Sequence, residues 1–149
     1  MSLVLDASVA IGWFLADGKA ADVAYAESVL GSLAGTQATV PTLWALEVAN
    51  VIAKCEAKGL VTEARSQAFI ALLDRLNIVA DHATHAHALG ATLQLARRYK
   101  LSSYDAAYLE LALRTGASLA TLDVDLQNAA ESAGVARPDF GASGGHLIP

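Results

Sequence analysis

The sequence predicts an α/β fold in which helices cover a parallel sheet. Short apolar runs that are typical of buried strands alternate with longer stretches in which apolar residues recur at helical spacing. This alternation indicates strand–helix–strand units, whose strands pair in parallel. The chain has 149 residues, of which 54% are hydrophobic and 17% charged, so it can form one domain with a substantial core.

Glycine, proline and hydroxyl residues mark where the predicted elements begin and end. Strands are expected at residues 3–5, 38–40, 77–80 and 118–122, with a last one at 137–140. Helices are expected at residues 7–16, 20–34, 42–58, 62–76, 84–99, 103–114 and 124–133. Gly35, Gly59 and Gly116 suit helix ends. Pro41 suits the start of a helix, and Thr62 suits an N-cap.

Four acidic residues occupy places where acids are usually avoided. Asp6 and Asp123 each follow a predicted strand directly, and ligands of open parallel sheets collect beyond the carboxyl ends of the strands. Glu47 and Asp105 lie on largely apolar faces of their predicted helices, where an ionised carboxylate loses several kcal/mol of solvation unless something compensates it. Brought together at one edge, these carboxylates would repel one another unless a divalent cation were present.

Three of the four acids also suit a structural role. Asp6, and Asp123 or Asp125, are placed to cap the helices that follow them, and Asp105 resembles the acidic end of a capping box. Glu47 has no such explanation, apart from a position at a rim where its carboxylate reaches water. Taken together, the acids favour a Mg²⁺ or Mn²⁺ site that serves phosphoryl transfer.

Four segments in order carry a family resemblance. They are Val4–Ser8 (VLDAS), Trp44–Asn50 (WALEVAN), Ser103–Tyr108 (SYDAAY) and Ala120–Asp125 (ATLDVD). From Leu3 to about Gly134 the chain resembles a PIN domain, and more closely the VapC-type toxin ribonucleases of bacterial toxin–antitoxin pairs. The resemblance implies a three-layer α/β/α fold with a short, mainly parallel central sheet. We expect one PIN-like domain over residues 1–140 and a flexible C-terminal tail over residues 141–149.

The resemblance also implies an activity: Mg²⁺- or Mn²⁺-dependent hydrolysis of RNA phosphodiester bonds by an endoribonuclease. The residues that match the family's acidic metal ligands are Asp6, Glu47, Asp105 and Asp123. Thr121 matches a hydroxyl position that holds these carboxylates, and Ser8 is a weaker match for a similar role. Asn50, one turn beyond Glu47, is either an orienting partner of that carboxylate or a surface amide, and Asp125 is a candidate supporting residue.

The net charge of −5 argues against a general nucleic-acid binder, because phosphate contacts require Lys and Arg. The basic run in this sequence is Arg97-Arg98-Tyr99-Lys100. It suits a helix C-terminus, and it also suits phosphate contacts, with Tyr99 available to stack on a base. Arg97, Arg98 and Lys100 are therefore candidate RNA contacts beside an acidic site that becomes cationic only after it binds metal.

Other sequence features exclude competing kinds of site. His82, His85 and His87 lack the spacing of a zinc site. Cys55 is the single cysteine, so an internal disulfide is excluded, and we expect it in the core. No apolar run approaches the ~18 residues of a membrane span, and no signal-peptide pattern is present, so we expect no membrane association and a cytoplasmic location.

The resemblance further implies partners, namely an RNA substrate, a cognate antitoxin and a second copy of the chain in a homodimer. Residues 20–34 and 42–76 are the usual region for such protein contacts. Two alternatives stay open: a non-catalytic PIN-like module that binds RNA or protein, and, with less support, another metal-dependent phosphohydrolase. An aspartate-nucleophile phosphatase usually has a second aspartate two residues after the first, where this chain has Ser8.

Overall fold

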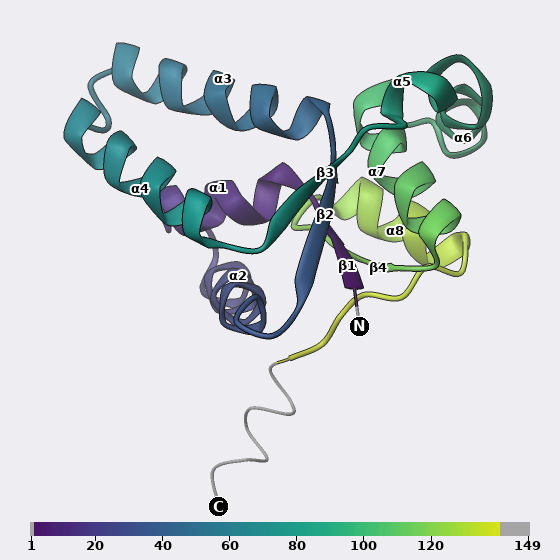
Figure 1. Ribbon diagram of the computed structural model, residues 1–149, viewed down its shortest axis with the longest axis horizontal. Coiled ribbons are helices and arrows are strands. Elements are labelled where there is room, and N and C mark those ends of the chain that lie inside the picture. The colour runs from purple at the N-terminus through teal and green to yellow at the C-terminus, as the bar shows by residue number, and fades with distance from the viewer. Residues whose placement is uncertain (1, 141–149) are drawn as a thin grey trace, which may run out of the picture.

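The computed structural model describes residues 2–140, which form one parallel sheet between layers of helices (Figure 1). The strands are β1 (Ser2–Leu5), β2 (Gln37–Pro41), β3 (Ile78–Asp81) and β4 (Ser118–Ala120). Their order across the sheet is β3-β2-β1-β4, and each neighbouring pair is parallel. In the central register Val4 lies opposite Thr39 on one side and Leu119 on the other. The predicted α/β/α class with a short, mainly parallel sheet is confirmed.

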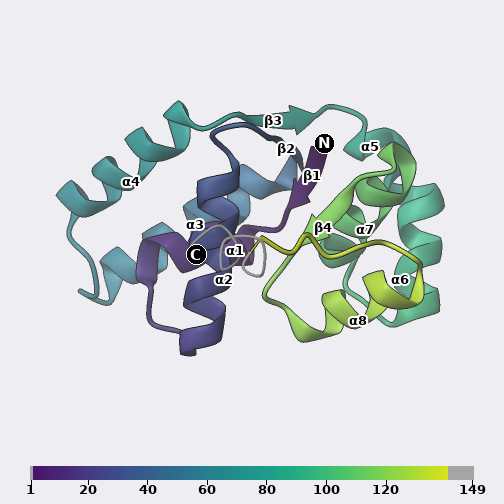
Figure 2. The same cartoon turned by 90° about the horizontal axis from the view of Figure 1, so that it is seen from below.

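The helices cover both faces of this sheet. They are α1 (Ala7–Leu15), α2 (Ala20–Ser32), α3 (Leu43–Ala57), α4 (Glu63–Arg75), α5 (Thr84–His87), α6 (Leu93–Tyr99), α7 (Ser103–Thr115) and α8 (Val124–Ser132). α7 lies across one face and contacts β1, β2 and β4, with α6 and α8 packed against it. α1 lies on the other side with α2 and α3 (Figure 2). Within residues 2–140 no helix is long and apolar enough to cross a membrane.

The central strand β1 is apolar from Leu3 to Leu5 because helices cover both of its faces. Leu3, Val4 and Leu5 are fully buried, as expected for a strand inside a parallel sheet, where no side chain faces water. The edge strand β3 is different, since Val79 and Ala80 are exposed. The carboxyl end of β1 therefore opens at the middle of the molecule, where side chains from several elements can meet.

Two predicted elements differ in detail from the structure. The helix predicted over residues 84–99 is interrupted by a π-helical turn at residues 88–92, in which Gly90 has φ −112° and ψ −107°. Glycine tolerates this non-helical conformation because it has no Cβ. The strand predicted over residues 137–140 is absent; instead the carbonyl of Ala136 accepts one hydrogen bond, of 2.9 Å, from the Leu119 N–H.

Two predicted boundaries also move. Pro41 is the last residue of β2, and α3 begins at Leu43. β4 ends at Ala120, so Thr121 and Leu122 form a link between the strand and Asp123. The expected C-terminal tail, residues 141–149, lies outside the described residues.

Candidate active site

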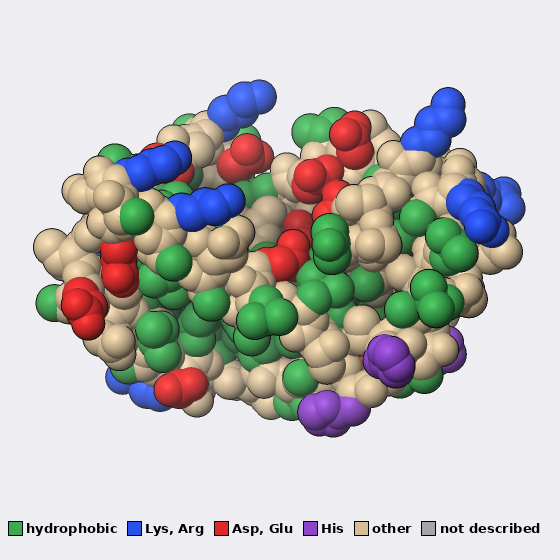
Figure 3. Space-filling view, turned by 90° about the horizontal axis from the view of Figure 1, so that it is seen from above, with side chains coloured by type: hydrophobic (Ala, Val, Ile, Leu, Met, Phe, Trp, Pro, Cys, Tyr) green, Lys and Arg blue, Asp and Glu red, His purple; other side chains and the backbone are tan. Residues whose placement is uncertain are grey.

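The four predicted acids face one hollow at the carboxyl edge of the sheet. Asp6 follows β1, Glu47 lies on α3, Asp105 is in the first turn of α7, and Asp123 precedes α8. All four line the same hollow, together with Asn50. Figure 3 shows acidic side chains gathered in a depression between two projecting parts of the molecule. The fold thus brings together residues that are far apart in the sequence.

Asp6 is held by two hydroxyl groups and is only 5% exposed. Its Oδ2 accepts hydrogen bonds from Ser8 Oγ at 2.6 Å and from Thr121 Oγ1 at 2.7 Å. Asp6 occupies the N-cap position of α1, but its side chain makes no capping hydrogen bond. The capping interpretation is therefore wrong for the Asp6 side chain, whose carboxylate lines the hollow instead.

The same two hydroxyl groups tie Asp6 to the segment after β4. Thr121 Oγ1 accepts a hydrogen bond from the Asp123 N–H at 3.0 Å, and Ser8 Oγ accepts one from the Leu122 N–H at 2.9 Å. A hydroxyl group has one proton to donate and lone pairs to accept with, so each can serve Asp6 and the backbone at once. The ends of β1 and β4 are therefore locked to each other beside the hollow.

Asp123 keeps the capping contact that the sequence suggests, whereas α7 keeps only the Ser102 half of its capping box, since no described hydrogen bond involves the Asp105 carboxylate. Asp123 Oδ1 accepts a 3.0 Å hydrogen bond from the Leu126 N–H and so caps α8. Ser102 caps α7 by accepting a 3.1 Å hydrogen bond from the Asp105 N–H. The carboxylate of Asp105 lies in the first turn of α7, where the helix dipole favours negative charge. Because a carboxylate has two oxygens, capping by one leaves the other available.

The carboxylate of Glu47 is held by Tyr108, a role that the sequence analysis missed. The hydroxyl of Tyr108 donates to Glu47 Oε1, and the tyrosine is fully buried. Asn50 is exposed and lines the hollow, but among the described hydrogen bonds the Glu47 carboxylate is bonded to Tyr108 and not to Asn50. Two features of the sequence could have indicated this role of Tyr108. It lies one turn after Asp105 on the same helix face, and a buried tyrosine hydroxyl needs a hydrogen-bond partner.

Burial and mutual repulsion raise the pKa values of three of these acids. Burial is the largest cause of the raised pKa of Asp6, Glu47 and Asp105. Repulsion adds to it: Asp123 raises the pKa of Asp6, while Asp6 and Asp105 raise that of Glu47. The pKa of Asp105 reaches about 6, and nearby Asp125 is one of the charges that contribute. Within residues 2–140 the ion pairs involve other acids, so no protein cation offsets this charge.

The donor set suits a hard divalent cation in chemistry and in charge. Carboxylate oxygens are the ligands that Mg²⁺ and Mn²⁺ prefer, and these four lack a counter-charge in the described part of the chain. As the side chains stand, no three Asp, Glu, His or Cys residues between positions 2 and 140 are close enough to hold one ion. Binding would therefore require carboxylates that now repel one another to rotate inward.

The three basic residues expected to contact RNA lie at the end of α6, and we call them the α6 patch (Arg97, Arg98 and Lys100). All three are exposed. Lys100 lines a shallow hollow together with Asp125, whose charge in turn acts on Asp105. Lys100 therefore lies beside α8, next to the acidic site, whereas Arg98 lines another hollow together with Glu110 and Arg114.

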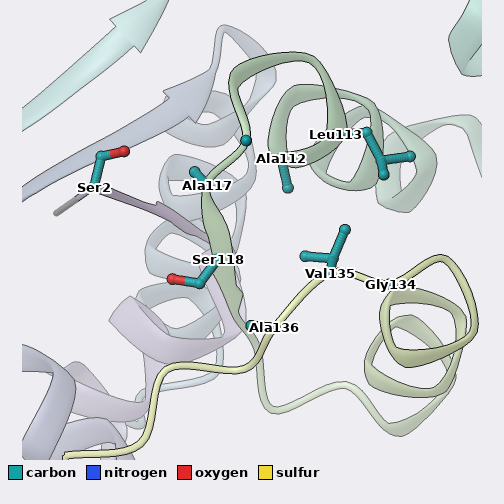
Figure 4. Close-up of a pocket in the computed structure, with 9 residues that line it drawn as sticks. Ser2, Ala112, Leu113, Ala117, Ser118, Gly134, Val135 and Ala136 are labelled. Atoms are coloured by element: carbon teal, nitrogen blue, oxygen red, sulfur yellow. The ribbon is translucent and has the colours of Figure 1, made fainter.

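A second hollow, at the opposite edge of the sheet, offers no catalytic groups. It lies at the amino ends of β1 and β4 and is lined by Ser2, Ser118 and small or apolar residues (Figure 4). No titratable side chain is among the residues that line it. The acidic hollow is therefore the better candidate for an active site.

Comparison with known families agrees with this assignment. The PIN domain family matches residues 3–132, which is most of the chain. The chain belongs to the PIN-domain family. The resemblance noted in the sequence is confirmed at the level of the family, and PIN domains are nucleases.

Solved structures share the fold at low sequence identity, and no curated protein matches significantly. A protein from Pyrobaculum aerophilum aligns with a TM-score of 0.61 and 21% identity, over 87% of this chain and 79% of that one. A toxin–antitoxin complex from Klebsiella pneumoniae aligns with a TM-score of 0.52 and 20% identity, over 81% of this chain and 86% of that one. VapBC2 from Rickettsia felis, bound to a DNA fragment from its promoter, aligns with a TM-score of 0.58 and 14% identity, over 86% of this chain and 92% of that one. These likenesses show a common fold.

Proposed function

We propose that this PIN-domain protein is an endoribonuclease that hydrolyses RNA phosphodiester bonds with the help of Mg²⁺ or Mn²⁺. The observation that carries the proposal is a group of four carboxylates that line one hollow and have no counter-cation among residues 2–140: Asp6, Glu47, Asp105 and Asp123. A purely structural cluster of acids would be expected to carry its own cation, because unpaired charge near the core is unfavourable.

The chain's own residues would orient these carboxylates for metal binding. Ser8 and Thr121 hold Asp6, and Tyr108 holds Glu47, in the way that hydrogen bonds commonly orient metal ligands. When bound, a divalent cation lowers the pKa of water and stabilises charge on a phosphoryl group. Attack by water that displaces the 3′-oxygen would give a 5′-phosphate and a 3′-hydroxyl, and it does not use the RNA 2′-hydroxyl.

We further propose that the protein is a cytoplasmic toxin with a cognate antitoxin, and that it forms a homodimer. The fold shared with the Klebsiella pneumoniae toxin–antitoxin complex supports this. So do exposed apolar side chains in the region expected for protein contacts: Leu46 is 74% exposed and Leu60 is 66% exposed. Such side chains commonly mark protein contact surfaces when they gather into patches.

The test is a cleavage assay on defined RNAs with purified protein. Mg²⁺ or Mn²⁺ is compared with excess chelator, and wild-type protein is compared with Asp6→Asn. We expect cleavage only with metal and only with Asp6 intact, whereas the matched variant Asp74→Asn, at an exposed position on α4, should cleave normally. Cleavage that survives both chelation and Asp6→Asn would overturn the metal mechanism.

The separation of the four acids favours one alternative, a non-catalytic PIN module that binds RNA or protein. Calorimetric titration with Mn²⁺ distinguishes the two functions. The enzyme is supported if the wild type binds Mn²⁺ and cleaves RNA, and if Asp6→Asn loses both the Mn²⁺ binding and the cleavage. RNA binding with neither metal binding nor cleavage supports the non-catalytic module.

A further inference from the structure

One face of α3 carries two lysines in line with Glu47. Successive residues of an α-helix are about 100° apart around its axis, so positions 54 and 58 return to within about 20° of position 47. Lys54 lies in the last turns of α3, and Lys58 is its C-cap residue, with a helical backbone (φ −85°, ψ −2°). Both side chains are exposed. We call this pair the α3 stripe (Lys54 and Lys58).

The α3 stripe is cationic and points the same way as Glu47, which lines the acidic hollow. Neither lysine forms an ion pair with a described residue. Glu56, the acid nearest to them in sequence, is about 180° from Glu47 around the helix and therefore points away. The nearer neighbours on the stripe's face are Asn50 and Val51, which are uncharged.

The α3 stripe and the α6 patch belong to different parts of the molecule. Figure 3 shows basic side chains on the projecting parts at both sides of the acidic hollow. The protein as a whole carries a net charge of −5, so attraction to a polyanion must come from such local groups. An RNA strand that crosses the acidic hollow would contact basic side chains on both sides of the four acids.

We propose that the α3 stripe is a second phosphate-binding site for the RNA substrate, so that the strand runs along α3, over the four acids and across the α6 patch. This inference rests on the proposed function and adds the path of the strand. With a rise of 1.5 Å per residue, Lys54 and Lys58 lie about 10 and about 16 Å along the helix from Glu47. They therefore contact phosphates beside the scissile one, and act on substrate binding more than on the chemical step.

Lys54 also has a structural explanation, because a cation in the last turns of a helix complements the dipole. The two roles have different consequences. A dipole contact affects the stability of α3 and leaves RNA binding unchanged. A phosphate contact releases counterions from the RNA and therefore affects the salt dependence of binding.

The experiment measures binding of a labelled single-stranded RNA to the wild-type protein, which is the parent, across a range of salt concentrations. Ca²⁺, another cation that oxygen ligands hold, replaces Mg²⁺, and a gel checks that the RNA stays intact. The double variant Lys54→Gln/Lys58→Gln should reduce the slope of log K against log salt by about 1.4, since each single-strand phosphate contact contributes ~0.7. Glutamine keeps a good helix propensity. In the cleavage assay the double variant should raise KM and leave kcat unchanged.

The matched control is Arg75→Gln, at an exposed position that precedes β3 and so lies toward the amino edge of the sheet, opposite the acids. Its salt slope should equal that of the parent. If the parent binds RNA and the double variant keeps the parental slope, the α3 stripe is not a phosphate site, although the proposed function stands. A change only in melting temperature or oligomeric state, with RNA binding intact, overturns the inference too. If the parent binds no RNA, the inference and the proposed function both fail.

Discussion

Two clusters of acids each include an acid at the carboxyl end of a strand, and among the described residues only one of these clusters carries its own cation. Asp81 is the last residue of β3, and Arg114 on α7 contacts it at 2.7 Å. Arg114 also contacts Glu110 at 2.7 Å, and Glu110 is only 5% exposed. The hydrogen bond from Arg114 lowers the pKa of Asp81. In the candidate active site the corresponding pKa values are raised.

The difference between the two clusters shows that an acid at the end of a strand is not by itself a sign of function. Asp81 and Asp6 both occur where a strand ends, yet Arg114 completes the first cluster from within the chain. The second cluster has hydroxyl groups that orient its carboxylates but no cation among the described residues. What marks the candidate site is the missing counter-charge, and four experiments test this distinction.

The largest effect is expected from giving the acidic site an arginine of its own. Asn50 lines the hollow and is exposed, so Asn50→Arg should place a guanidinium among the carboxylates and make them resemble the Arg114 cluster. Loss of an orienting partner alone costs ~10- to 100-fold in such sites, so displacement of the metal should cost roughly 100-fold or more in cleavage. Asn50→Gln is the control. Full activity in Asn50→Arg would show that the counter-charge does not matter.

Removing the built-in cation from the other cluster should destabilise the protein. Breaking a buried ion pair typically costs ~3–5 kcal/mol, and for Arg114→Gln we expect about 2–3 kcal/mol because the Arg114 side chain is 26% exposed. Denaturant unfolding measures the change. Arg75→Gln, at an exposed position, should change stability by less than about 0.5 kcal/mol. Equal effects of the two variants would mean that the Arg114 cluster contributes little.

Loss of the tyrosine hydroxyl should weaken metal binding about tenfold. Tyr108→Phe keeps the buried ring and removes the hydrogen bond to Glu47, and such orienting partners typically contribute 10–100-fold to metal affinity. Calorimetric titration with Mn²⁺ checks this. The control is Tyr104→Phe, because Tyr104 is exposed on the same helix. Unchanged affinity in Tyr108→Phe would remove Tyr108 from the site.

The smallest effect concerns stability against pH without metal. The pKa of Asp105 is raised from 3.8 to about 6, so the folded state binds the proton more tightly than the unfolded state does. The contribution of Asp105 to stability is therefore fully present below about pH 4 and is lost as the pH rises through about 6. At pH 7 in chelator, Asp105→Asn should stabilise the protein by about 1 kcal/mol, a value reduced because the position is partly exposed.

Thermal unfolding from pH 4 to pH 8 in chelator measures this effect. The wild type should lose melting temperature across the range, and Asp105→Asn should lose less, with a difference of about 2–4 °C at pH 7. Asp74→Asn serves as the matched exposed control. A melting temperature of Asp105→Asn below that of the wild type at pH 7 would contradict mutual repulsion in the site.

Local pattern in the sequence was sufficient to predict the layers of the fold. Strands and helix ends are set mainly by residues close together in the sequence, such as the apolar run Leu3–Leu5 and the helix-ending Gly59 and Gly116. The structure has β1, α3 and α7 where these local signals predict them. The interruption at Gly90 was missed, because a single glycine is tolerated inside a helical pattern and does not by itself mark a break. Thr121 and Leu122 were assigned to a strand because they continue its apolar pattern.

The candidate site was harder to predict, because its contacts join distant positions. The positions of the acids were visible as acids in apolar surroundings, but their partners were not. Tyr108 looked like part of an apolar face until its hydroxyl was seen to meet Glu47. Likewise, the pairing of Arg114 with Asp81 bridges 33 residues, and no spacing rule in the sequence indicates it.

The hydrogen bond from Thr121 to Asp6 spans 115 residues, and it has a consequence during synthesis. A ribosome delivers Asp6 near the start of the chain and delivers Thr121 and Asp123 more than a hundred residues later. Until then Asp6 lacks one of the two hydroxyl groups that orient it, and the set of carboxylates is incomplete. An unfinished chain therefore has no assembled acidic centre while it is still close to the translation machinery. The proposed cleavage activity arises only when nearly the whole domain has emerged.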